Sequence, residues 1–130
     1  MTVGGPSKYW IVPPEILNPL KEEFKFDFDP CPYPRPEGFD GLTCEWGNCN
    51  WVNPLFGRGI TSWVRKAIVE NQKGKTVVLI LPLDNWVRLL LEAKAEIRVV
   101  GKHRWIHAET GDSRPSSRPS FLFILRGEKA

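Results

Sequence analysis

Cysteine is scarce in this chain, and its few copies do not form a recognisable set. Cys31, Cys44 and Cys49 include no Cys-x-x-Cys pair and have no matching histidine cluster. The sequence therefore predicts no zinc site and no other metal site. An odd and sparse set also favours reduced thiols over a disulfide framework.

Long apolar runs are missing as well. No stretch approaches the roughly 18 uninterrupted apolar residues of a membrane span, and the N-terminus lacks a basic segment followed by an apolar one. We therefore expect a soluble, cytoplasmic protein with no membrane partner. A formal charge of +3 and a pI near 8.9 permit contact with a polyanion without requiring it.

The length of 130 residues and the apolar content of 42% suffice for one ordinary core. We expect a single domain over residues 1–130, without a separate recognition domain. Proline and glycine are concentrated before residue 60, whereas residues 60–100 show regular elements with clear start and stop signals.

The periodicity of apolar residues predicts helices at 13–24, from Thr61 as cap to 72, and at 85–95 with Asp84 as cap. Strands are predicted at 25–29, 50–52, 76–83, 96–100 and 121–125. The run 76–83 is apolar throughout, as in a fully buried parallel strand. Residues 110–120, which contain Ser-Arg-Pro-Ser twice, are expected to form a polar loop. This order predicts an α/β fold with a mostly parallel sheet and an antiparallel C-terminal strand at its end.

Asn53 and Pro54 directly follow the strand predicted at 50–52, and open α/β sheets bind their ligands beyond such strand ends. An Asn-Pro pair at such a place suits the activation of a planar amine such as that of adenine. This amine is a poor nucleophile because its lone pair is delocalised into the ring. The Asn53 side-chain oxygen and the Pro54 carbonyl can accept its two hydrogens and favour tetrahedral geometry. Proline holds that carbonyl rigidly, and Phe56 offers an aromatic face to an extruded base.

Two acidic turns each have a structural and a functional interpretation. Asp29-Pro30-Cys31 closes a predicted strand, and Asp40-Gly41 can form a simple turn. Either carboxylate can instead hydrogen-bond a nucleoside cofactor. Of the six tryptophans, Trp63 and Trp86 are expected in the core, whereas those near the strand ends can pack against ligands; these are Trp10, Trp46, Trp51 and Trp105.

Together, Asp29-Pro30-Cys31, Asp40-Gly41-Leu42 with Trp46, and the segment Trp51-Val52-Asn53-Pro54-Leu55-Phe56-Gly57 resemble the phage-type DNA N6-adenine methyltransferase (Dam-like) family. Trp10-Ile11-Val12-Pro13-Pro14-Glu15 is similar to the aromatic and Thr-Pro segment near the start of its members, with valine in place of threonine. The likeness covers nearly the whole chain, which would be an unusually short member.

The resemblance implies a truncated Rossmann-like fold that binds S-adenosylmethionine and methylates adenine in DNA, in a bacterial, archaeal or phage-infected cell. It implies catalytic roles for Asn53, Pro54 and Phe56. The implied cofactor contacts are Trp10, Val12, Pro13, Asp29, Pro30, Cys31 and Asp40. The implied DNA contacts include Lys102, His103 and Arg104, a basic segment that the family shares, together with Leu55, Arg58, Arg114 and Arg118.

Two other interpretations stay open. The same motif type also serves methyltransferases that act on RNA adenine or protein glutamine. The second interpretation is a non-catalytic subunit with a degenerate methyltransferase fold, which binds nucleic acid or a partner. It is suggested by Leu55, which replaces a usual proline, and by residues 32–37, which replace a glycine-rich cofactor loop. The expected truncation of the sheet also makes a homodimer one of the expectations.

Overall fold

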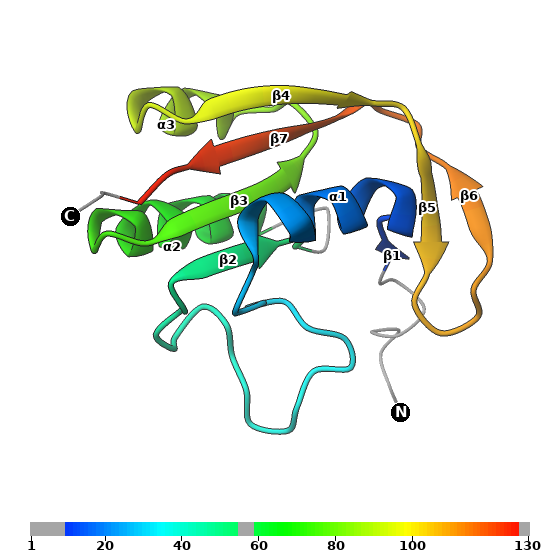
Figure 1. Cartoon of the computed structure of the whole chain (residues 1–130), viewed down its shortest axis with the longest axis horizontal. Helices are drawn as coiled ribbons and strands as arrows, with labels where there is room; N and C mark the ends of the chain where they lie inside the picture. Colours follow the sequence, from blue (N-terminus) through cyan, green and yellow to red (C-terminus); the bar gives the residue numbers. More distant parts are fainter. Residues whose placement is uncertain (1–9, 55–58, 128–130) are drawn as a thin grey trace.

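The computed structural model describes residues 10–54 and 59–127, and within these ranges the chain forms two sheets and three helices (Figure 1). The larger sheet has the order β2 (Cys49–Val52), β3 (Thr76–Leu81), β7 (Ser120–Leu125) and β4 (Glu96–Gly101). The smaller sheet has the order β1 (Trp10–Ile11), β5 (Arg104–His107) and β6 (Ser113–Pro115). The helices are α1 (Pro14–Phe24), α2 (Ile60–Gln72) and α3 (Val87–Glu92).

The strand directions show that the prediction of a mostly parallel, Rossmann-like sheet is wrong. Among the named strands of the described residues, only β2 and β3 pair in parallel; β7 is antiparallel to both β3 and β4, and the smaller sheet is antiparallel throughout. The chain is a small mixed α/β domain.

The antiparallel direction predicted for the last strand is confirmed, but β7 lies inside the sheet rather than at its end. Its composition explains this place. Leu122 and Ile124 pack in one apolar cluster and Phe123 and Leu125 in the other, so both faces of the strand are buried. A strand that is apolar on both faces is stable only in the interior of a covered sheet.

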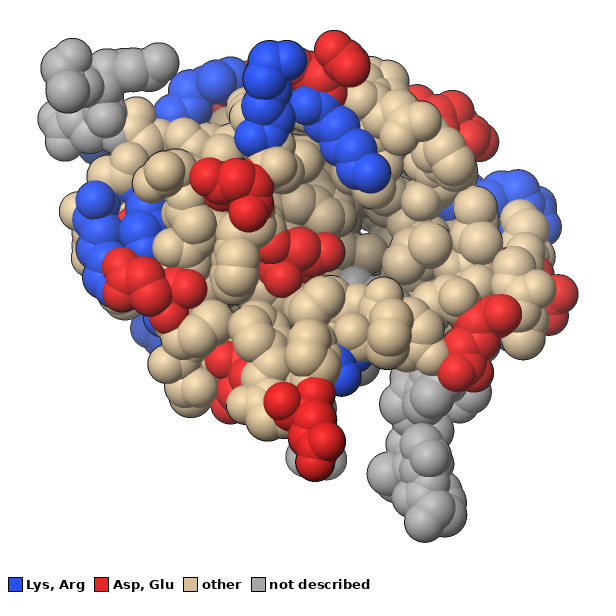
Figure 2. Space-filling model, turned by 60° about the horizontal axis from the view of Figure 1, so that its bottom comes forward, with Lys and Arg blue, Asp and Glu red and all other residues tan. Residues whose placement is uncertain are grey.

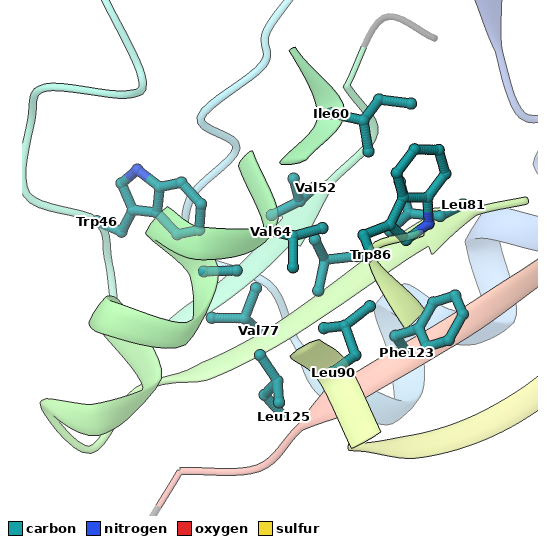
Figure 3. Packing of buried hydrophobic residues seen from close by; sticks show 12 residues of the cluster. Trp46, Val52, Ile60, Val64, Val77, Leu81, Trp86, Leu90, Phe123 and Leu125 are labelled. Carbon is teal, nitrogen blue, oxygen red and sulfur yellow. The ribbon is translucent and has the colours of Figure 1, made fainter. Parts of the chain in front are cut away.

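Helices cover both faces of the larger sheet. Side chains of α2 and α3, including Val64 and Leu90, pack on one face against Val77, as Figure 3 shows. On the other face, α1 packs through Leu20 against a cluster that includes Val78. Because successive residues of a strand point to opposite faces, the apolar run of β3 contributes to both clusters.

Several local predictions need correction. The strand predicted at 25–29 is reduced to a bridge between Phe28 and Asn50. Gly59, in the left-handed region at φ 97°, is the N-cap of α2 instead of Thr61, and Trp86 is the N-cap of the short helix α3 instead of Asp84. The predicted polar loop at 110–120 contains β6, which carries no apolar signal.

Most of the tryptophans pack in or against the core. Trp86 is buried as expected, and Trp63 is partly buried against the same cluster. Trp46 and Trp51 are buried too.

Within the described residues, no helix is long and apolar enough to span a membrane, and no group of three His, Cys, Asp or Glu side chains is placed to hold a metal ion.

Candidate active site

A cavity of about 720 Å³ opens where β2 and β3 end, and we call it the strand-end cavity. Asn53 and Pro54 reach it from β2, and Pro82 and Asp84 reach it from β3. The two strands are parallel, so the segments that leave their carboxyl ends meet at the same edge of the sheet. The strand end that the sequence identifies therefore does border a cavity of ligand size.

The smaller sheet forms the opposite wall of this cavity. Trp10 pairs with His107 across β1 and β5, and Trp105 pairs with Arg114 across β5 and β6. Side chains at opposed positions, and at alternate positions along a strand, share one face. Trp10, Trp105 and Arg114 consequently line the cavity together, with the Arg114 guanidinium 4.6 Å from the centre of the Trp10 ring.

A second cavity of about 490 Å³ adjoins the first, and we call it the adjoining cavity. Its lining includes Val12 after β1, Asp29 and Tyr33 from the segment between α1 and β2, and Trp51 of β2. Asn53 lines both cavities. Asn53 therefore lies between the strand-end cavity, which is aromatic and basic, and the adjoining cavity, which is more acidic.

The Asn53 side chain is held in a defined orientation. It is 3% exposed, and its Nδ2 donates a hydrogen bond of 3.3 Å to the main-chain carbonyl of Trp10. Because the amide nitrogen is used in this way, the orientation of the whole carboxamide is fixed relative to β1. Pro54 follows with its φ restrained by the ring.

Asp29 lies in a partly dehydrated environment beside Asn53. Burial raises the pKa of its carboxyl, although Oδ1 accepts a 2.8 Å hydrogen bond from the Cys31 N–H, which opposes the rise. Burial also raises the pKa of the Cys31 thiol, the Asp29 charge adds to this, and a hydrogen bond with the Asn53 backbone opposes it. Asp29 is thus a carboxyl group that a ligand in the adjoining cavity can hydrogen-bond.

The other residues predicted to contact a cofactor are less central. Pro13 and Pro30 are buried, and Pro13 is the N-cap of α1. Asp40 is exposed, and its Oδ1 accepts a hydrogen bond of 2.9 Å from the Leu42 N–H within its own turn. Trp10 lines the strand-end cavity, whereas Val12 and Asp29 line the adjoining one.

The predicted DNA contacts fall into two groups. Arg114 and Arg118 line the strand-end cavity, and Arg118 donates to the Leu83 carbonyl and lies 3.8 Å from the Asp84 carboxylate. Lys102, His103 and Arg104 are outside both linings. His103 is hydrogen-bonded to Ser120, and Arg104 to Ser113. Leu55, Phe56 and Arg58 lie outside the described residues.

A comparison with protein families identifies the chain. Residues 5–130 match the model of the family described as DNA N-6-adenine-methyltransferase (Dam). The chain belongs to the Dam family. This confirms the resemblance predicted from the motifs, and the family's general activity is the methylation of adenine in DNA. No curated protein matches the chain, and no solved structure does.

Some residues of this Dam-family site were not predicted from the sequence. Asp84 was expected to be a helix cap and Trp86 a core residue, yet both line the strand-end cavity. A usable signal existed for Asp84, because it comes shortly after the carboxyl end of a buried strand, where ligands of α/β sheets bind. Trp86 packs in the core and borders the cavity at once, which periodicity alone does not reveal.

Charges are mixed on the face of the Dam-family chain that carries the segment between α1 and β2. Figure 2 shows acidic and basic side chains interspersed there, rather than one continuous basic track. Contact with a polyanion on this face would therefore depend on a few well-placed side chains. Arg114 and Arg118 are predicted DNA contacts that line the strand-end cavity.

Proposed function

We propose that the chain transfers a methyl group from S-adenosylmethionine to N6 of an adenine in DNA. The target base would enter the strand-end cavity and the cofactor the adjoining cavity. The observation that carries this proposal is the position of Asn53, which lines both cavities with its carboxamide oriented by the Trp10 carbonyl.

The adjoining cavity suits a charged nucleoside cofactor. Asp29 offers a carboxyl group for hydroxyl or ammonium donors, Tyr33 adds a phenol, and Phe28 and Trp51 add aromatic surface. The volume of about 490 Å³ falls within the range of small-molecule sites. When bound, S-adenosylmethionine supplies an electrophilic methyl group; the protein's task is to hold and orient the two partners.

The strand-end cavity suits a base taken out of the DNA stack. Extrusion costs a few kcal/mol, and stacking on an aromatic side chain offsets about 1–3 kcal/mol per base. Trp10, Trp86 and Trp105 provide aromatic surface of this kind. Arg114 and Arg118 are positioned to contact the flanking phosphates, which fix the position of the strand without reading its sequence.

Asn53 and Pro54 would activate the amine. The Asn53 side-chain oxygen and the Pro54 carbonyl accept the two N6 hydrogens, so that the nitrogen lone pair is drawn out of the ring and toward the methyl donor. As the new N–C bond forms, the S–CH3 bond of the sulfonium would break and leave a neutral thioether, and N6 would then lose one of its two hydrogens to water as a proton. Acceptors held in place in advance need no reorganisation during the reaction, which is the main source of rate enhancement at such sites.

The test is to identify the product. Purified protein is incubated with methyl-labelled S-adenosylmethionine and separate pools of unmethylated DNA, RNA and protein, and digested DNA is analysed by mass spectrometry. The proposal predicts label in DNA as N6-methyladenine. Label confined to RNA or protein would move the activity to another acceptor. No labelling at all, together with no calorimetric binding of S-adenosylmethionine at millimolar concentration, would favour a non-catalytic subunit.

A further inference from the structure

His107 lies beside the proposed active site but is not among the residues that line the two cavities. It is 9% exposed and stands opposite Trp10 in the pairing of β1 with β5. The two ring centres are 4.9 Å apart and the ring planes are 88° apart, an edge-to-face contact. This contact adds to the pairing with β5, which for β1 extends over only two residues.

The hydrogen bonds of His107 define its protonation. Its Nδ1 accepts two main-chain hydrogen bonds, from the Glu109 N–H at 3.1 Å and from the Thr110 N–H at 3.2 Å. A ring nitrogen can accept only when it carries no proton, so this geometry requires a neutral imidazole with its proton on Nε2. The turn is closed further by a 3.0 Å hydrogen bond from the Gly111 N–H to the His107 carbonyl.

The same pair of strands reaches the proposed catalytic amide. Trp10, whose indole packs against His107, accepts the Nδ2 hydrogen bond of Asn53 on its main-chain carbonyl. A contiguous set of contacts therefore runs from the turn after β5, through His107 and Trp10, to Asn53. A change at His107 would therefore act first on the turn and on the Trp10 ring, and through Trp10 on the Asn53 side chain.

We infer that His107 is a positioning residue for methyl transfer. Its neutral imidazole, fixed by the hydrogen bonds that Nδ1 accepts, holds Trp10 in place, and the Trp10 carbonyl in turn orients the Asn53 carboxamide. The inference rests on the proposed function. A proton on Nδ1 would face two N–H donors, so protonation breaks both hydrogen bonds.

Charged groups on the surrounding segments already have partners. Arg114 of β6 lies over the Trp10 ring, and Arg104 of β5 hydrogen-bonds Ser113. In the turn, Glu109 accepts a 2.6 Å hydrogen bond from the Tyr33 hydroxyl, and Asp112 contacts His107 through its main-chain carbonyl at 2.8 Å. The acceptor role of Nδ1 thus depends on main-chain N–H groups, which do not titrate.

Two substitutions separate this role from simple packing. In His107→Phe the aromatic ring that packs against Trp10 is kept but the Nδ1 acceptor is lost, whereas in His107→Asn the side-chain oxygen can accept the two N–H groups but the ring is lost. We expect His107→Phe to lower kcat about tenfold, with KM for DNA and cofactor within about threefold, because the ring then lacks the hydrogen bonds that fix its position. His107→Asn should lower kcat to a similar extent, because it lacks the ring that contacts Trp10. A wild-type kcat in His107→Phe would reduce the role of His107 to packing and overturn the inference.

A second measurement does not depend on turnover. In ¹⁵N-labelled wild-type protein, the imidazole signals of His107 should report an unprotonated Nδ1 at neutral pH, and the Asn53 side-chain amide signal, assigned by its loss in Asn53→Ala, should shift in His107→Phe. A proton on Nδ1 at neutral pH, or an Asn53 signal that is the same in the wild type and in His107→Phe, would contradict the inference. Absence of methyl transfer with these signals intact would instead count against the proposed function alone.

Discussion

Replacing Glu70 by glutamine should destabilise the protein strongly and in a pH-dependent way. The Glu70 side chain is fully buried, with ion pairs of 2.8 Å to Lys66, 3.1 Å to Lys73 and 2.5 Å to Lys75. It also accepts a 3.3 Å hydrogen bond from the Trp46 N–H. The carboxylate thereby ties α2 to β3 and to the segment before β2.

The magnitude follows from the pKa of Glu70. Burial would raise that pKa, but the hydrogen bonds from Lys66, Lys75 and Lys73 outweigh burial and lower the pKa from 4.5 to about 2. A difference of this size corresponds to about 3 kcal/mol of folding free energy. Because the pKa is lower in the folded state, this contribution is complete above about pH 4.5 and is lost as the pH falls toward 2.

Urea unfolding at neutral pH and near pH 3 tests this reasoning. Glu70→Gln should lose about 3 kcal/mol of unfolding free energy at neutral pH and roughly half as much near pH 3. Glu45→Gln is the matched control, because Glu45 contacts Lys73 and Lys75 as well but is exposed, and we expect a much smaller change. A loss in Glu70→Gln that is the same at both pH values would refute the electrostatic account.

Two further predictions concern the segment before β2 and the wall of the strand-end cavity. A Cβ at Gly41 would clash with the Pro30 carbonyl oxygen, so Gly41→Ala should lower the free energy of unfolding by about 1–3 kcal/mol, measured by thermal unfolding. Alanine at the exposed Glu37 is the control and should cost little. Equal stability of the two variants would contradict the tight packing at Gly41. Arg114→Ala should raise KM for DNA about tenfold and reduce the salt dependence of DNA binding by about one phosphate contact, with cofactor affinity unchanged. Arg88→Ala, on the exposed side of α3, is the control, and the same loss in both variants would contradict a contact specific to the cavity.

The elements with strong local signals could be predicted from the sequence. The apolar run of β3 and the helical spacing of Val64 and Ala67 in α2 predict their elements because burial on a sheet or helix face requires these periods. The place of β7 between β3 and β4 could not be predicted, since it depends on pairing between residues 19 or more positions apart. Local patterns carry no information on such partners.

The candidate site was predictable only in part, for a similar reason. Asn53 is found by a local rule, because it follows a strand. The opposite wall of the cavity comes from β1 and β6, which have two and three residues and no apolar alternation. The strand-end cavity, which these short strands complete, therefore forms only when the chain folds and could not be predicted from local patterns. The same holds for the contact of Trp10 with Asn53.

The most direct test of the central claim is single-turnover methyl transfer by Asn53→Ala. Asn53 lines both cavities, so removal of its carboxamide should slow the transfer to DNA at least about 100-fold, as with other preorganised polar groups, while the calorimetric Kd for S-adenosylmethionine stays within about threefold. Asn85→Ala, an exposed asparagine at the same end of the sheet, should keep the wild-type rate. A wild-type rate in Asn53→Ala would contradict the account.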